Sequence, residues 1–95
     1  MSYDLADIID DYHEKCATLL QDAAAGSAEQ SAYSHILQAI DRDKDRPANE
    51  RVGGIAATLM ALYRASSHPE VRVIIQKWAK DFIRDTGIGD PRVHF

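Results

Sequence analysis

The sequence contains a single cysteine and no apolar run long enough to cross a membrane. Cys16 has no second cysteine with which to form an internal disulfide or a structural zinc site. A bilayer requires about 18 consecutive apolar residues, and the first residues, MSYDLADIIDD, are acidic where a secretory signal is basic. We therefore expect a cytoplasmic protein with a reduced, buried thiol and no membrane partner.

Large apolar side chains are also scarce. Of the 43 hydrophobic residues among 95, 14 are alanine and 24 are Val, Ile, Leu, Met, Phe or Trp. Burying each large apolar side chain contributes about 1.5–3 kcal/mol, whereas ordering each residue costs about 1.5 kcal/mol, so the folding free energy of a monomer is close to zero. We expect one helical domain over residues 1–95 that is stabilised as a homo-oligomer, most simply a dimer.

Basic residues are rare in the first part of the chain. Residues 1–40 contain seven acids and one base, Lys15, whereas residues 41–95 contain eight acids and ten bases. The net charge of −4 therefore hides a charge of −6 in the first part and +2 in the second. Phosphates repel an acidic segment, so the first part favours a basic protein surface or the chain's own basic half as its partner.

Apolar residues recur at the three- and four-residue spacing of amphipathic helices in four segments of the chain. The β-branched run at 71–75 has strand propensity, but its apolar stripe continues to residue 83 at helical spacing. The predicted fold is all-α, a compact bundle of about four antiparallel helices with short loops. The expected helices and tail lie near 4–24, 28–44, 48–66, 69–86 and 87–95.

Short polar residues and glycine mark the ends of the first two helices. We expect Ser2 or Asp4 to cap the first helix and Gly26 to end it, because glycine adopts the left-handed conformation without strain. Ser27 and Gln30 have the spacing of a capping box, in which each side chain bonds a backbone amide of the other's turn. This box predicts the start of the second helix.

Proline and glycine mark the last two helices. Pro47 and Pro69 suit the first turn of a helix, and Gly87 is expected to close the last one. Ser67 and Glu70 repeat the capping-box spacing. These residues predict helix starts near 48 and 69.

The third predicted helix has one face of small residues. Gly53, Ala57 and Ala61 are spaced by four, and a glycine inside a helix costs about 1 kcal/mol relative to alanine. We expect this face to lie against another helix, because close packing compensates that cost.

Two combinations of residues in the first helix have the spacing of a chemical site. His13 and Cys16 lie three apart, as a base and a nucleophile would. Asp10, His13 and Glu14 resemble a fragment of a di-metal site, but the remaining ligands are missing. The interpretation we favour is a packed thiol beside a solvated acidic face, in a protein that is not an enzyme and uses no metal or cofactor.

The acidic face is the candidate binding surface. Asp7, Asp10, Asp11 and Glu14 follow one another along the first helix, and like charges at this spacing destabilise an isolated helix by tenths of a kcal/mol each. A basic protein partner would compensate this repulsion. We therefore favour a small acidic binding or inhibitor protein with the first helix as its contact face.

The alternative function uses the opposite charge. Lys77, Lys80 and Arg84 form a basic ridge on the fourth predicted helix, and Arg64 and Arg72 flank the turn before it. Asp81 and Asp85 interrupt the ridge and the total charge is negative, so nucleic acid is disfavoured. The alternative is a helical oligomer that sequesters an anionic, cyclic nucleotide at Arg64, Arg72, Lys77 and Lys80.

Two resemblances accompany these hypotheses. The segment Leu59-Met60-Ala61-Leu62-Tyr63-Arg64-Ala65, followed by Pro69, is similar to the last helix of the phage cyclic-oligonucleotide sponge family, whose members are small helical oligomers. The family's upstream polar motif has no counterpart here, so no ligand residue is carried over. In size, acidity and helical content the chain also looks like bacteriocin immunity proteins, a likeness of class without a shared motif.

Overall fold

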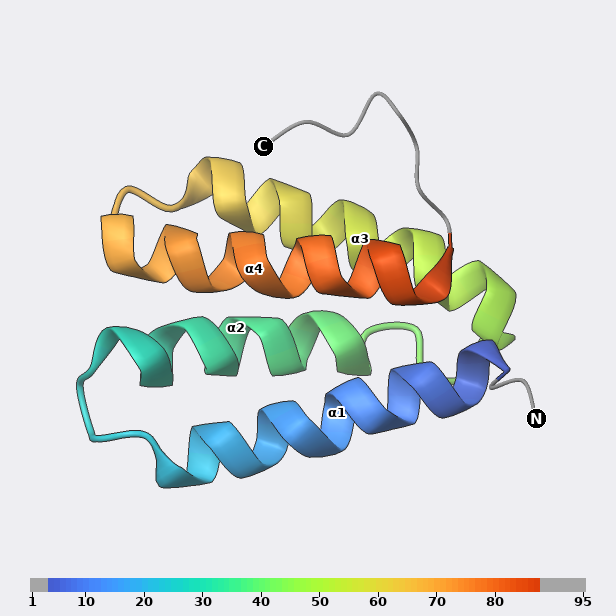
Figure 1. The fold of residues 1–95 in the computed structure, drawn as a ribbon, viewed down its shortest axis with the longest axis horizontal. Helices are drawn as coiled ribbons and strands as arrows, with labels where there is room; N and C mark the ends of the chain where they lie inside the picture. Colours follow the sequence, from blue (N-terminus) through green and yellow to red (C-terminus); the bar gives the residue numbers. More distant parts are fainter. Residues whose placement is uncertain (1–3, 88–95) are drawn as a thin grey trace.

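The computed structural model describes residues 4–87, and in this range the chain forms helices and no strand. The helices are α1 (Leu5–Asp22), α2 (Ala28–Asp41), α3 (Ala48–Ala65) and α4 (Pro69–Thr86), which pack as a bundle (Figure 1). The predicted all-α, four-helix fold is confirmed. None of the described helices combines the length and apolarity needed to cross a membrane. The expected tail after Gly87 lies outside the described residues.

The start of α1 agrees with the prediction and its end does not. The Asp4 side chain accepts a hydrogen bond from the Asp7 amide at 2.9 Å, so Asp4 is the cap, while Ser2 lies outside the described residues. Helix α1 ends at Asp22 with Ala23 as its C-cap, two residues before the expected end. Gly26 does have a positive φ, +77°, but it lies in the turn before α2. Gly26 therefore serves the start of α2 rather than the end of α1.

The capping box at the start of α2 forms in a shifted arrangement. Ser27 Oγ accepts from the Gln30 amide at 3.1 Å, as predicted. The Gln30 side-chain oxygen accepts from the Gly26 amide at 2.7 Å instead of from the Ser27 amide. Helix α2 ends at Asp41, three residues earlier than expected, because the alternating charges that follow provide no apolar face to hold a helix.

Helix α4 has the predicted bounds but a different N-cap. Pro69 is its first residue, and Gly87 ends it with φ +70° while its amide donates to the Ile83 carbonyl at 3.1 Å. The N-cap is His68, without a side-chain cap bond, so the capping box predicted at Ser67 is wrong. The reason is that Pro69 occupies the first helical position and so places the cap one residue later than Ser67.

Two arginines join consecutive helices. Arg51 Nη2 donates to the Ile40 carbonyl near the end of α2 at 3.0 Å, and Arg72 Nε donates to the Tyr63 carbonyl near the end of α3 at 3.2 Å. Each arginine is the fourth residue of its own helix. Carbonyls in the last helical turn have no partner within their helix, and a cation there also offsets the negative end of the helix dipole.

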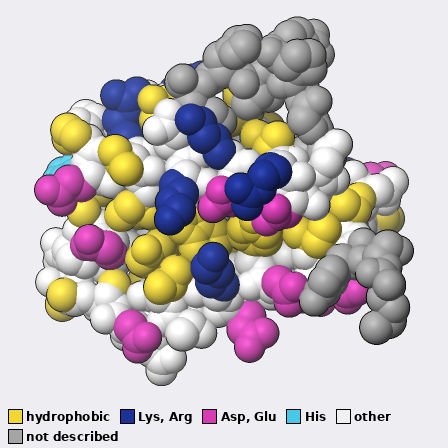
Figure 2. All heavy atoms as spheres, in the orientation of Figure 1, with side chains coloured by type: hydrophobic (Ala, Val, Ile, Leu, Met, Phe, Trp, Pro, Cys, Tyr) yellow, Lys and Arg dark blue, Asp and Glu magenta, His cyan; other side chains and the backbone are white. Residues whose placement is uncertain are grey.

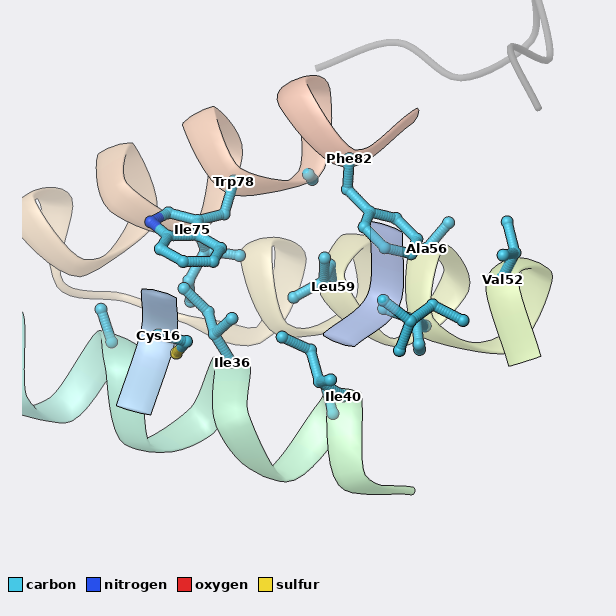
Figure 3. Close-up of a cluster of buried hydrophobic side chains, with 14 of the residues drawn as sticks. Cys16, Ile36, Ile40, Val52, Ala56, Leu59, Ile75, Trp78 and Phe82 are labelled. Carbon is cyan, nitrogen blue, oxygen red and sulfur yellow. The ribbon is translucent and has the colours of Figure 1, made fainter. Parts of the chain in front are cut away.

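The core contains residues from all four helices (Figure 3). Phe82 of α4 and Ile9 of α1 are each 1% exposed, and no polar or charged residue among those described is buried. Helix α1 buries only Ile9 and Cys16, whereas α4 buries five residues. The largest fully buried side chains are Phe82, Ile9, Ile36, Ile40, Ile55, Leu59, Ile75, Val52 and Cys16.

The small-residue face of α3 does not contact another helix of this chain. Gly53, Ala57 and Ala61 are all exposed, and a Cβ at Gly53 would meet no atom within 4 Å. Within residues 4–87, the expectation of close packing on this face is therefore wrong. The opposite face carries Val52, Ile55, Ala56 and Leu59, and burying these larger side chains removes more apolar area from water.

Candidate functional site at the groove between α1 and α4

A surface groove separates α1 from α4. Its deeper part has a volume of about 590 Å³ and is lined by Ile8, Asp11, Tyr12 and Lys15 of α1 and by Asp85 of α4. A smaller hollow of about 430 Å³ adjoins the groove on α1 and shares Asp11 and Lys15 with it, and Glu14, Thr18 and Leu19 complete its lining. Figure 2 shows a band of hydrophobic side chains between the two helices on this face.

Aromatic rings form the floor of the groove. The Tyr12 ring meets Phe82 edge to face at a centroid distance of 5.2 Å and Trp78 at 5.7 Å. Tyr33 of α2 packs against the other side of the cluster, 6.0 Å from Trp78. Trp78 and Phe82 are buried, so the half-buried Tyr12 is held on a fixed base. Edge-to-face pairs stabilise such a cluster beyond the area that they bury.

One polar contact crosses the groove. The Tyr12 hydroxyl donates a short hydrogen bond to Asp85 Oδ2, and Arg84 Nε donates to Asp85 Oδ1 at 3.1 Å. The bond from Tyr12 and then the bond from Arg84 lower the pKa of Asp85. Burial, followed by the bond to Asp85 and its charge, raises the pKa of Tyr12. At neutral pH the pair is a phenol donor and a carboxylate acceptor.

Lys15 lies above the aromatic floor. Its Nζ is 5.6 Å from the centroid of the Trp78 ring, a cation–π geometry. Lys15 is also the single base among the first 40 residues. The rim of the groove on the α1 side therefore combines one cation with the carboxylates of Asp11 and Glu14.

The four predicted acidic residues are all exposed, but only two reach the groove. Asp11 lines the groove and Glu14 lines the adjoining hollow on α1, whereas Asp7 and Asp10 are exposed on α1 outside both linings. Within residues 4–87, none of the four carboxylates forms an ion pair. The sequence did not predict the contacts of Tyr12 and Lys15 with α4. Each of these residues directly follows one of the predicted acids, since Tyr12 comes after Asp11 and Lys15 after Glu14.

His13 and Cys16 do not form a catalytic pair in this structure. His13 Nε2 lies 2.8 Å from Asp41 Oδ1 at the end of α2, a partner that the sequence analysis missed. The Cys16 thiol is buried and donates to the Tyr33 carbonyl at 3.2 Å. Burial, with a smaller contribution from Asp41, raises the pKa of Cys16 to about 11. The prediction of a packed, buried thiol is confirmed.

The arrangement of the described side chains does not support the metal-binding hypothesis either. Among the described residues there is no group of three or more His, Cys, Asp or Glu side chains arranged to hold a metal ion. Asp10, His13 and Glu14 lie on the same helix, but His13 Nε2 contacts Asp41 at the end of α2.

The basic residues of the alternative hypothesis have different surroundings. Arg64, Lys77 and Lys80 are exposed. Arg72 is half-buried, and its guanidinium carbon lies 4.5 Å from the centroid of the Tyr63 ring while its Nε bonds the Tyr63 carbonyl. Arg72 therefore has a structural role at the junction of α3 and α4. None of the four residues lines the groove between α1 and α4.

The fold and groove define a small all-α protein with an amphipathic surface between its first and last helices. Comparison of the chain with protein-family models, with curated proteins and with solved structures found no match. Functional inference for this chain therefore rests on its own residues and their geometry.

Proposed function

We propose that this protein is a cytoplasmic, non-catalytic binding or inhibitor protein whose acidic α1 face contacts a basic protein partner. The observation that carries the proposal is the set of exposed carboxylates at Asp7, Asp10, Asp11 and Glu14, which have no ion-pair partner within residues 4–87. A lone, buried cysteine is consistent with a reducing compartment.

Three of the acids on α1 lie where they do not stabilise the helix. Asp4 and Asp7 lie at the positive end of the helix dipole, where acids are favourable. Asp10, Asp11 and Glu14 lie beyond that end, and their mutual repulsion at helical spacing opposes helix formation. A partner's lysines and arginines would turn this repulsion into attraction and would accelerate encounter by long-range steering.

The groove beside these charges supplies the apolar part of a contact. Ile8 and Leu19 are half-buried along its α1 side, and Tyr12 forms its floor. The aliphatic stems of lysine and arginine pack on such surfaces while their charged ends meet carboxylates. Asp11 and Glu14 lie where those ends would be placed.

Charge reversal on α1 tests the proposal. The wild-type protein, the Asp10→Lys/Asp11→Lys variant and a control are immobilised and exposed to extract from the source cells, and captured proteins are quantified by mass spectrometry. The control is Glu29→Lys, which reverses an exposed acid on α2. We expect a basic protein that binds wild type and control, is lost from the double variant and dissociates as salt increases.

The same experiment contains the contradicting result. If the captured proteins are unchanged by Asp10→Lys/Asp11→Lys, α1 is not the contact face. Far-UV circular dichroism establishes that the variants keep their helices, so a lost partner reflects lost charge rather than lost fold.

The alternative, sequestration of an anionic cyclic nucleotide, has less support. Arg72 already bonds Tyr63, so it retains fewer donors for a ligand, and Asp81 and Asp85 lie beside Arg84 on α4. Calorimetric titration with cyclic dinucleotides tests this function directly. Binding that is abolished by Arg64→Ala and unaffected by Asp10→Lys/Asp11→Lys would replace the first proposal by the second.

A further inference from the structure

Helix α1 is the least buried helix of the bundle. It buries two residues, Ile9 and Cys16, whereas α2 and α3 bury four each and α4 buries five. Leu5, Tyr12 and Leu19 of α1 are only partly buried against the core. All the other buried residues belong to α2, α3 and α4, so these three helices carry most of the core among themselves.

The ion pair that joins α1 to α2 is also weaker than the contacts at the other two helix junctions. Arg51 of α3 and Arg72 of α4 are half-buried, and each donates to a backbone carbonyl of the preceding helix. The pair between His13 of α1 and Asp41 has side chains that are 43% and 52% exposed. Exposed ion pairs contribute little to stability, because water competes for both charges.

The remaining polar contacts of α1 are weak or solvent-exposed. The Cys16 thiol bonds the Tyr33 carbonyl of α2, but a thiol is a poor hydrogen-bond donor. The Tyr12 hydroxyl bonds Asp85 of α4, which is exposed. Within residues 4–87, the side chains of α1 therefore make no polar contact comparable with those of Arg51 and Arg72.

Helix α1 is connected to α2 by a segment that can change conformation without loss of packing. Residues 23–27 form this connection, and Ala24, Ala25 and Gly26 are exposed. Gly26 has a positive φ, +77°, and glycine adopts both signs of φ with little cost. The connection thus has the properties of a hinge.

We infer that α1 is a releasable helix, which undocks as a unit from a core of α2, α3 and α4 that stays folded. Openings of this kind require less free energy than global unfolding, because they break only the contacts of one unit. Release of α1 uncovers the Cys16 thiol and the sides of Trp78 and Phe82 that meet the Tyr12 ring. The inference is independent of the proposed function, since it concerns the chain without any partner.

The reactivity of Cys16 tests the release of α1. Cys16 is the only cysteine and is fully buried, so its reaction with a chromogenic aromatic disulfide requires an opening. The comparison is Cys16→Ala/Ala79→Cys, whose thiol replaces a fully buried alanine of α4. Each rate in the absence of urea is divided by the rate of the same chain unfolded in urea. We expect the α1 thiol to react at least about tenfold faster than the α4 thiol.

Arg72→Ala distinguishes release of α1 from unfolding of the whole bundle. This substitution, added to both chains, weakens the junction of α3 and α4, which remains closed when α1 alone is released. The α4 thiol should therefore react about tenfold faster, because its exposure requires that junction to open. The rate of the Cys16 thiol should change by less than about twofold.

Amide hydrogen exchange of the wild-type chain supplies a measurement without any substitution. The amides in the middle of α1 should exchange at least about tenfold faster than those of Leu59 in α3 and Ile75 in α4. Equal normalised rates for the two thiols, equal acceleration of both by Arg72→Ala, or equal protection of the amides in α1, α3 and α4 would each overturn the inference. Any of these results would show that α1 opens only with the whole bundle. They would leave the proposed function standing, because a partner can bind α1 in its docked position.

Discussion

Helices α1 and α4 have the same length, but they differ in how many residues they bury and in the charges that they expose. Helix α1 buries two residues, Ile9 and Cys16, and presents carboxylates to solvent. Helix α4 buries five residues and presents Lys77, Lys80 and Arg84 together with Glu70 and Asp85. The inner residues of an amphipathic helix hold the bundle together, whereas its outer charges are exposed to solvent.

Removing a core side chain from each helix should break the bundle to different extents. Phe82→Ala in α4 is expected to lower the free energy of unfolding by about 3–5 kcal/mol, and Ile9→Ala in α1 by about 2–3 kcal/mol. Phe82 is the larger side chain and also packs against Tyr12. Helix α1 has only one other buried residue, so it can move to fill the space that Ile9→Ala leaves. Urea denaturation measures both changes, and a larger loss from Ile9→Ala would reverse our ranking of the two helices.

The contact that joins the two helices across the groove should have a smaller effect. Tyr12→Phe keeps the ring packing and removes the hydrogen bond to Asp85, which should cost about 1 kcal/mol at neutral pH. Thermal unfolding at pH 7 measures this cost. An unchanged melting temperature would show that solvent replaces the bond without loss.

The same variant should flatten the alkaline limb of the stability profile. The pKa of Tyr12 is raised in the folded protein, so above about pH 10 the unfolded chain releases its phenolic proton first and stability falls as pH rises. Tyr12→Phe removes this contribution. Tyr33→Phe is the comparison variant, since burial raises the pKa of Tyr33 as well but no side-chain acceptor within residues 4–87 bonds its hydroxyl. Equal slopes for wild type and Tyr12→Phe between pH 9 and 11 would contradict the assignment.

Altering the outer charges of α1 should change stability little. Asp10→Lys/Asp11→Lys removes repulsion among exposed carboxylates, so we expect the free energy of unfolding to rise by a few tenths of a kcal/mol at low salt. The gain should disappear as salt screens the charges. A loss of more than about 1 kcal/mol would show that these acids support the fold.

The smallest effect is expected on the exposed face of α3. Ala57→Leu enlarges a side chain that is exposed to solvent. We therefore expect the free energy of unfolding, measured by thermal unfolding, to change by no more than about 0.5 kcal/mol. Packing against another helix would instead cost about 1–3 kcal/mol through overpacking. The size of the change therefore distinguishes a solvent-exposed face from the helix–helix contact that the spacing of the small residues predicts.

Local signals account for the parts of the fold that the sequence predicted. Asp4 caps α1, Pro69 starts α4 and Gly87 ends it, because each acts on the backbone within one turn of its own position. The exposure of the candidate acids on α1 could likewise be predicted, because exposed positions follow from the helical period once the apolar stripe is known. The sequence predicts later ends for α1 and α2 than the structure has, because no apolar contact extends either helix further.

The sequence by itself determined the number of helices, most of their bounds and the opposite charges of α1 and α4. Only the tertiary structure decided which side of α3 faces the core, that His13 meets Asp41, and that Tyr12 and Asp85 close a groove between the first and last helices. Helical spacing reports which residues share a face, but it carries no information on what that face meets. That choice depends on how much apolar area each arrangement buries, a property of the four helices together.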